Sequence, residues 1–345
     1  MNVGLIGCGG IAQGHLRVYQ NIKDAKVVAV ADIDLTKAKA TAARFGVNKF
    51  FSEYVDLLET KDLDLVDICT PTSTHASIVI DAARFKRNIL VEKPMALSVE
   101  ECDKMILETK RQGVKLCVCH NQIFFPAIRQ ARSIIDSEGR HLVFCRTSNL
   151  ENPTLSQSPK WILSPEEKGV LWETGCHPAY LQLYFLKDIS EVYAVGSKVN
   201  CQVYNNFAVL LKSSNQAYGL IEVSFIAKHG EVTLETETSD GKGYLIDGDN
   251  NPSLEEKARA SFPSDVRRIL HHLPLRPIAP RSAGGKLGYF VGHYYLVSEY
   301  LRNIKKDAPP PVQPEDGRRT ISLLENIEKS LDTHQVVKSF SSRAR

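Results

Sequence analysis

The first 120 residues alternate between short, apolar, β-rich runs and segments with helical periodicity. Alternation of this kind folds into a parallel sheet that is covered by helices on both faces. We therefore predict a doubly wound α/β domain over residues 1–121. The expected strands are Val3–Ile6, Val27–Ala31, Leu65–Cys69, Ile89–Val91 and Leu116–Cys119. The expected helices lie near Ile11–Tyr19, Thr36–Phe45, His75–Arg84 and Val99–Gln112.

The pattern changes after residue 121, where a helix near Pro126–Ser137 is followed by longer β-rich runs and turns. This pattern predicts an α+β domain over residues 122–345 with a large open, mostly antiparallel sheet. Helices near Tyr289–Ile304 and Gly317–Thr333 close the chain and can pack back on the first domain. A broad sheet seldom leaves an apolar face bare, so we expect a homodimer or homotetramer joined through it. The expected strands are Leu142–Asn149, Val192–Val199, Asn206–Lys212, Tyr218–Ile226, Val232–Thr238 and Gly243–Asp247.

Composition narrows the class of partner and the compartment. The net charge of +3 over 345 residues is small, which argues against a nucleic-acid or membrane partner. No apolar run approaches the roughly 18 residues of a membrane span. The eight cysteines show no C-x-x-C spacing, so we expect reduced thiols, a cytoplasmic protein and no metal site.

A glycine-rich turn follows the first expected strand. The segment Gly7-Cys8-Gly9-Gly10-Ile11-Ala12 fits the pattern G-x-G-x-x-A and opens a helix. Its glycines allow a tight turn and a close backbone approach, and the helix offers free N–H groups to a pyrophosphate. The turn therefore predicts a dinucleotide site formed by Gly7, Gly9, Gly10, Ile11 and Ala12.

An acidic residue stands at the end of the second expected strand. A carboxylate there accepts hydrogen bonds from the adenosine ribose hydroxyls, and it repels a 2′-phosphate. We assign this role to Asp32, with Ile33 beside it, and expect NAD in preference to NADP because no arginine follows closely. Asp34, further into the loop, is an alternative, and Asp32 could instead cap the following turn.

Two further strand ends carry polar residues. The segment Thr70-Pro71-Thr72-Ser73-Thr74-His75 follows the third expected strand, where ligands of open α/β sheets lie. We expect Thr70, Pro71, Thr72 and His75 to contact the cofactor, although Thr74 could simply cap a helix. Glu92-Lys93-Pro94 follows the fourth, and there a lysine can donate to a substrate oxygen. Burial and a positive nicotinamide ring would lower its pKa.

With these motifs in place, the chain resembles the glucose–fructose oxidoreductase, inositol dehydrogenase and MocA-like family of NAD(P)-dependent oxidoreductases. The glycine turn, the Thr-Pro-Thr loop and Glu92-Lys93-Pro94 occur in that family's order and spacing. Trp161, Gly169 and Glu173-x-Gly175-x-His177 follow in the same order, so the resemblance covers nearly the whole chain. It implies a nucleotide-binding domain followed by an open antiparallel sheet, with substrate held between them.

The resemblance also implies roles for individual residues. His177 would take the hydroxyl proton of the substrate, and Lys93 would hold the same oxygen. Glu173 stands where the family usually has an aspartate that contacts substrate hydroxyls, and Tyr180 stands where another aspartate is frequent. The remaining expected substrate contacts are Asn121 and Trp161, while Glu92 and Lys93 would also border the cofactor.

These expectations describe an oxidoreductase that moves a hydride between nicotinamide and a CH–OH carbon of a sugar, inositol or nucleotide-sugar-like substrate. Two alternatives stay open: a non-enzymatic NAD-binding sensor, and an enzyme that uses retained NAD for redox-assisted elimination or glycoside cleavage. The basic stretch from Arg267 to Lys286 is either a solvated surface or a site for an anionic substrate group.

Overall fold

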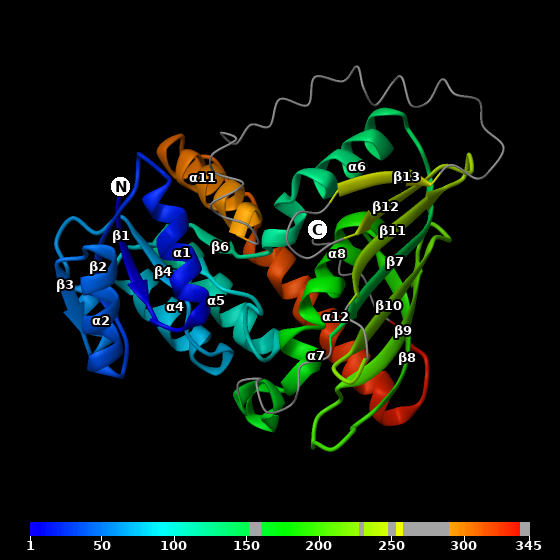
Figure 1. Ribbon diagram of the computed structural model, residues 1–345, viewed down its shortest axis with the longest axis horizontal. Helices are drawn as coiled ribbons and strands as arrows, with labels where there is room; N and C mark the ends of the chain where they lie inside the picture. The colour runs from blue at the N-terminus through cyan, green and yellow to red at the C-terminus, as the bar shows by residue number, and fades with distance from the viewer. Residues whose placement is uncertain (152–159, 228–230, 248–252, 258–289, 339–345) are drawn as a thin grey trace.

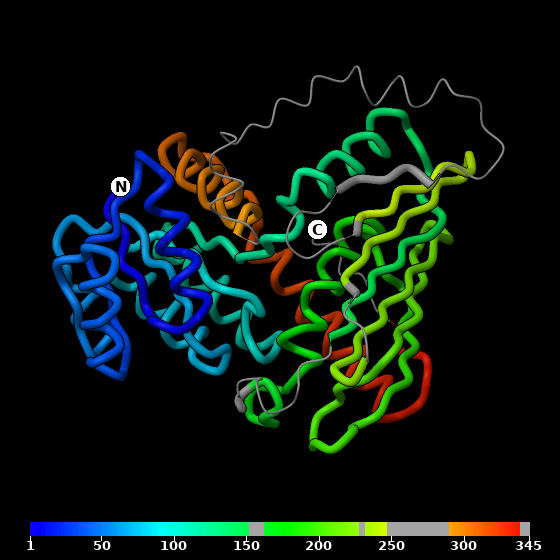
Figure 2. Tube along the Cα trace, in the orientation of Figure 1, coloured from blue at the N-terminus to red at the C-terminus, as the bar shows by residue number. Residues whose placement is uncertain are grey.

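The structure is a computed structural model, and it describes residues 1–151, 160–227, 231–247, 253–257 and 290–338. Figure 1 shows two sheets, each with its own helices, standing side by side. The Cα trace in Figure 2 shows the third component, C-terminal helices that lie between them. The arrangement confirms the predicted α/β part followed by an α+β part. The basic stretch from Arg267 to Lys286 lies outside the described residues.

The first sheet is parallel, with strands in the order β3-β2-β1-β4-β5-β6. Its strands are buried because helices cover both faces. They are β1 Asn2–Ile6, β2 Lys26–Ala31, β3 Lys49–Phe51, β4 Leu65–Ile68, β5 Asn88–Val91 and β6 Leu116–Val118. The helices are α1 Gly10–Gln20, α2 Leu35–Phe45, α3 Tyr54–Leu58, α4 His75–Arg84 and α5 Val99–Gln112, with the short η1 Thr72–Thr74.

The second sheet has eight described strands in the order β13-β12-β11-β7-β10-β9-β8-β14. Every pair is antiparallel except β7 and β10, which run parallel side by side at its centre. The strands are β7 Leu142–Leu150, β8 Ile189–Ser197, β9 Asn206–Ser213, β10 Tyr218–Ser224, β11 Glu231–Thr238, β12 Gly243–Asp247, β13 Ser253–Lys257 and β14 Val337–Lys338. The helices before β8 are η2 Asn121–Phe124, α6 Pro126–Ser137, η3 Lys160–Leu163, η4 Pro165–Glu167, α7 Gly169–Glu173 and α8 Cys176–Leu186.

Among the described elements, helices cover one face of this second sheet. α8 packs on β7 and β10, and α12, Pro314–Thr333, packs on β8. Figure 1 shows the opposite face without a covering layer among the described elements. The large apolar side chains exposed on these strands include Tyr193, Val195, Leu210 and Tyr218.

Two C-terminal helices tie the sheets together. In α11, Val291–Lys305, the buried Tyr300 hydroxyl lies 2.9 Å from the carbonyl of Ile89 and 2.7 Å from that of Lys115. α12 packs on α5 and β6 of the first sheet as well as on α8 and β8 of the second. A Cβ on Gly317 would meet Met95 at 2.7 Å, so glycine permits this close approach.

The predicted elements differ from the structure mainly at ends and edges. α12 begins at Pro314 instead of near Gly317, because proline suits the first helical turn and Gln313 forms a capping box with Asp316. The short edge strands β3, β13 and β14 were not predicted, since two to five residues carry little periodic signal. Among the described residues, no helix has the length and apolar character needed to cross a membrane.

Candidate functional site

Four parallel strands bring the predicted cofactor residues to one edge of the first sheet. β1, β2, β4 and β5 all run in the same direction, so their carboxyl ends meet there. The glycine turn follows β1, Asp32 follows β2, Thr70 lies just after β4, and Glu92 follows β5. This is the edge at which ligands bind in open α/β sheets.

The glycine turn is shaped to receive an anion. Gly7 has φ of +90°, and a Cβ there would lie 2.5 Å from the carbonyl oxygen of Cys69. By contrast, a Cβ on Gly9 or on Gly10 would meet nothing within 4 Å, so the outer side of the turn is open. α1 begins at Gly10 without a side-chain cap, which leaves its first N–H groups available to a phosphate.

The Asp32 carboxylate accepts two backbone hydrogen bonds from the loops beside it. Its Oδ2 accepts the backbone N–H of Cys8 at 2.8 Å, and its Oδ1 accepts that of Asp34 at 2.9 Å. Each carboxylate oxygen has a second lone pair, so ribose hydroxyls can still be bound. Asp34 instead caps α2 through Thr36 and Lys37. The neighbouring Ile33 side chain is 95% exposed, which leaves an apolar surface beside the turn.

The Thr-Pro-Thr loop is held from below by His75. Its ring is buried, and its two nitrogens each lie 2.9 Å from a carbonyl oxygen, of Thr70 and of Pro94. Burial lowers the pKa of His75, so the ring is neutral and donates to one of the two carbonyls. With both nitrogens facing backbone, His75 links the two loops. Two residues before His75, the Ser73 hydroxyl donates to Oε1 of Glu167 in η4 at 2.5 Å. This bond joins the two halves of the molecule.

Lys93 reaches across to the second half of the molecule. Its Nζ lies 2.5 Å from Oε1 of Glu173 and 3.2 Å from the Glu173 carbonyl. Burial favours the neutral amine, but the carboxylates of Glu173 and Glu92 outweigh it and raise the pKa of Lys93 above its ordinary value. The expected lowering of this pKa is therefore wrong for the protein alone, because Glu173 faces the lysine. The peptide bond between Lys93 and Pro94 is cis.

His177 lies at the start of α8 with a hydroxyl behind it. Its Nδ1 is 2.8 Å from the hydroxyl of Tyr180, one turn further along the helix. That hydroxyl also receives the backbone N–H of Gln122 at 3.3 Å and lies 3.4 Å from Oδ1 of Asn121. Burial, then the positive charge of Lys93, lower the pKa of His177 well below its ordinary value. His177 is thus a neutral base close to a charged lysine.

Tyr180 and Asn121, two of the expected substrate contacts, are buried close to His177. The Tyr180 ring is 3% exposed and stacks on His120 with ring centroids 4.3 Å apart. Asn121 is 1% exposed, and its amide nitrogen lies 3.4 Å from Nδ1 of His293. Tyr180 therefore orients the His177 ring, and Asn121 in turn accepts from the Tyr180 hydroxyl.

The structure describes the side chain of Trp172 but not that of Trp161. Trp172 is fully buried, as expected for a core residue, and Lys168 stands over its ring at 4.1 Å. Trp161, an expected substrate contact, belongs to η3, but its side chain lies outside the described part of the chain.

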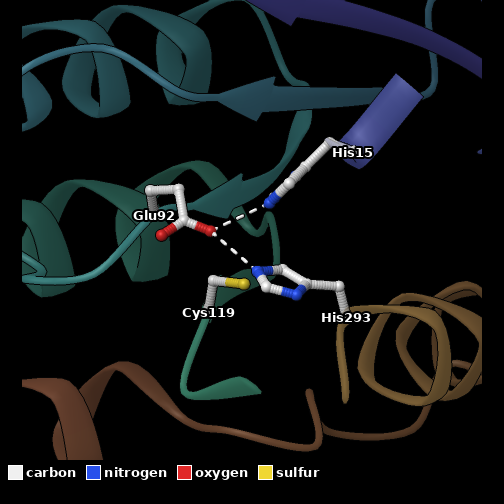
Figure 3. A group of neighbouring side chains, drawn as sticks. All are labelled: His15, Glu92, Cys119 and His293. Atoms are coloured by element: carbon white, nitrogen blue, oxygen red, sulfur yellow. Dashed lines mark hydrogen bonds and ion pairs between the residues drawn. The ribbon is translucent and has the colours of Figure 1, made fainter. Parts of the chain in front are cut away.

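A buried polar cluster beneath Lys93 was not predicted. Figure 3 shows His15, Glu92, Cys119 and His293 converging from α1, the end of β5, the end of β6 and α11. Their donor atoms, nitrogen, oxygen and sulfur, all lie within 4.8 Å of one another. One sequence feature could have indicated this cluster, since Asp67 interrupts the otherwise apolar run Leu65–Ile68. In the structure its carboxylate lies 2.8 Å from Nδ1 of His15.

Comparison with known proteins identifies relatives of both halves. The profile described as "Oxidoreductase family, NAD-binding Rossmann fold" (GFO_IDH_MocA) matches residues 1–120, and that of the GFO/IDH/MocA C-terminal domain matches residues 128–244. The myo-inositol 2-dehydrogenase of Thermotoga maritima is 25% identical over 98% of each chain.

Solved structures share the fold over nearly the full length. Levoglucosan dehydrogenase in complex with NADH and levoglucosan superposes with a TM-score of 0.84 at 21% identity, covering 98% of each chain. The WlbA dehydrogenase of Bordetella pertussis, in complex with NADH and UDP-GlcNAcA, gives 0.81 at 18% identity and the same coverage. The matches confirm the predicted fold class and the NAD-binding domain.

The geometry predicts how the His177 pKa responds to its neighbour. Replacing Lys93 by methionine removes a positive charge while the ring stays buried, so the His177 pKa should rise toward its ordinary value. Histidine NMR titration measures the shift, with the resonance assigned by His177→Gln. Lys168→Met, which removes a lysine that pairs with Glu328, is the matched control and should leave the pKa unchanged. An unchanged His177 titration in Lys93→Met would show that the two groups are not electrostatically coupled.

Proposed function

Because the chain belongs to the Gfo/Idh/MocA family of NAD-dependent oxidoreductases, we propose that it interconverts a CH–OH group and a carbonyl on a sugar, inositol or related polyol. One observation carries the proposal. Lys93 and Glu173, from opposite halves of the molecule, meet beside His177 at the sheet edge that bears the open glycine turn. Relatives named myo-inositol 2-dehydrogenase, D-apiose dehydrogenase and levoglucosan dehydrogenase support a polyol substrate.

The hydrogen bonds around Tyr180 favour one tautomer of His177. Tyr180 has a single hydroxyl hydrogen, and the Oδ1 of Asn121 is an acceptor for it. The hydroxyl oxygen can then accept the N–H groups of Gln122 and of His177 Nδ1. In this arrangement Nε2 of His177 carries no hydrogen and is free to take a proton from the substrate hydroxyl.

Lys93 suits the complementary role of stabilising the oxygen that loses its proton. Its ammonium stays charged beside Glu173, and it donates a hydrogen bond to an oxyanion more strongly than to a neutral hydroxyl. Glu173 holds the ammonium in place and can accept a bond from a neighbouring substrate hydroxyl. NAD, when bound, supplies the hydride acceptor. Gly7, Gly9 and Gly10 would hold its pyrophosphate, Asp32 its ribose and Ile33 its adenine face.

All eight cysteines are free thiols, and seven of them are buried. Thiols without disulfide partners accord with a reducing compartment, and we place the protein in the cytoplasm.

The face of the second sheet that no described element covers favours a homodimer or homotetramer. On that face Tyr193 of β8 lies opposite Leu210 of β9, and the two residues are 39% and 51% exposed.

We expect substitution of either proton-handling residue to slow turnover. Lys93→Ala and His177→Ala should each reduce kcat by about 10²- to 10⁴-fold, because a positioned acid or base contributes about that much. NAD affinity should persist in both. Stopped-flow absorbance at 340 nm with myo-inositol, D-apiose and levoglucosan measures the rate, and deuterated substrate identifies the hydride step. Fast hydride transfer in His177→Ala would assign the base elsewhere, and product formed without NADH release would indicate internal redox chemistry.

Cofactor choice should depend on the charge of Asp32. The wild type should bind NAD more tightly than NADP, and Asp32→Asn should narrow the difference by removing repulsion of the 2′-phosphate. Asparagine keeps one oxygen that can accept the Cys8 N–H, although it loses the acceptor of the Asp34 N–H. Titrations of both cofactors followed by tryptophan fluorescence test this. Equal or tighter NADP binding by the wild type would contradict the preference.

Assembly should depend on the apolar face of the second sheet. Leu210→Glu places a charge on this face and should shift the protein toward a monomer of 38.5 kDa in light scattering. Leu107→Glu is the control, since Leu107 is also an exposed leucine but lies on α5, away from this sheet. A wild type that is already monomeric at micromolar concentration would reject the assembly.

A further inference from the structure

The Glu92 carboxylate is the centre of the buried cluster drawn in Figure 3. Its Oε1 lies 2.9 Å from Nε2 of His15 and 3.7 Å from Nε2 of His293. Its Oε2 accepts the backbone N–H of Lys93 at 3.1 Å. Glu92 is only 4% exposed, so all these contacts are made inside the protein. One carboxylate therefore touches the cofactor helix, the lysine backbone and α11.

His15 must carry a positive charge to make the bonds observed. Its Nδ1 lies 2.8 Å from Asp67 and its Nε2 lies 2.9 Å from Glu92, and both partners are carboxylates. A neutral imidazole has one N–H and can donate to only one of them, whereas an imidazolium donates to both. Burial opposes this charge, but Asp67 outweighs it, and the pKa of His15 is raised well above its ordinary value.

The chain of contacts connects the glycine turn with the lysine. His15 stands in α1, five residues after Gly10, within the helix that begins at the turn. The helix also packs against the start of α11, where the N-cap residue Phe290 occupies the space that a Cβ on Gly14 would need. A shift of α1 would therefore move His15 and, through Glu92, the backbone of Lys93.

We propose that His15 is a positioning residue, which through Glu92 fixes Lys93 relative to the helix that begins at the cofactor turn. The inference rests on the proposed function, because Lys93 is taken to act on the substrate oxygen. If His15 has this role, binding of the cofactor at α1 and alignment of Lys93 are energetically coupled. His15 itself touches neither substrate nor cofactor.

The same donor atoms would suit a zinc ion, so a zinc ion and a proton have to be distinguished as the group that His15 and Glu92 share. Two His nitrogens, a carboxylate and a thiol form a set that zinc accepts, with Asp67 behind His15 as an outer partner. Here, however, His15 and Glu92 are joined at 2.9 Å, an ordinary N–H···O distance. This distance favours a proton between His15 and Glu92.

The test compares His15→Gln, Glu92→Gln and the double variant. Hydride transfer at saturating NAD, followed by stopped flow with whichever panel polyol the wild type oxidises, should fall about 10- to 100-fold in each single variant. The double variant should be no slower than the slower single one, because His15 acts through Glu92. Losses that multiply would show two independent effects and overturn the proposal.

A second measurement needs no substrate. In His15→Gln the His177 pKa, followed by NMR, should rise in the same direction as in Lys93→Met, because the ammonium is displaced. If the wild type oxidises no polyol, the proposed function fails, and this titration alone decides the positioning role. An unchanged His177 pKa together with unchanged hydride transfer would overturn it.

Controls separate positioning from folding and from metal binding. Thr109→Val removes a buried hydroxyl that bonds only within its own helix, and it should leave both measurements unchanged. If His15→Gln does not fold, Asp67→Asn keeps the ring but weakens its charge and should give a smaller change in the same direction. Elemental analysis of the purified protein should find no stoichiometric zinc. One zinc per chain, lost in Cys119→Ser but kept in Cys117→Ser, would replace the proposal by a metal site.

Discussion

A charged group that is buried without a partner destabilises a protein by several kcal/mol, and this requirement organises the interior around the end of β5. Glu92 and Asp67 share the charge of His15, and Lys93 is matched by Glu173 from the other half of the molecule. The pairs lie one behind the other, from the core to the sheet edge. Lys93 is thus linked to the core through a sequence of paired charges.

The buried histidines show how partners decide the charge of a side chain. His15 faces two carboxylates and is an imidazolium. His75 faces two carbonyls, His177 faces a hydroxyl, and in both burial lowers the pKa. In His120, too, burial lowers the pKa, to about 3. The same residue type therefore provides a fixed charge, a loop support and a neutral base within one site.

Strand positions and motifs at strand ends could be predicted from the sequence, because local pattern determines them. Apolar runs located the strands of the first sheet to within one residue at most ends, and motif positions at strand ends placed the glycine turn, Asp32 and Lys93 on one edge. Side-chain direction was beyond this reasoning, because it depends on packing between distant segments. Tyr180 turns inward because its ring stacks on His120, and the pKa of Lys93 rises because Glu173 faces it. His293 joins Glu92 only through the fold, and no motif marks it.

The position of α12 has a consequence for how the chain is made. Its residues cover β6 and α5 on one side and β8 and α8 on the other, and Tyr300 of α11 caps two carbonyls of the first sheet. Both helices are synthesised after the first sheet. The first 120 residues therefore expose apolar surface until α12 has been made, however early their strands pair. A nascent chain that stalls before α12 should present that surface to chaperones, and neither half should mature ahead of the other.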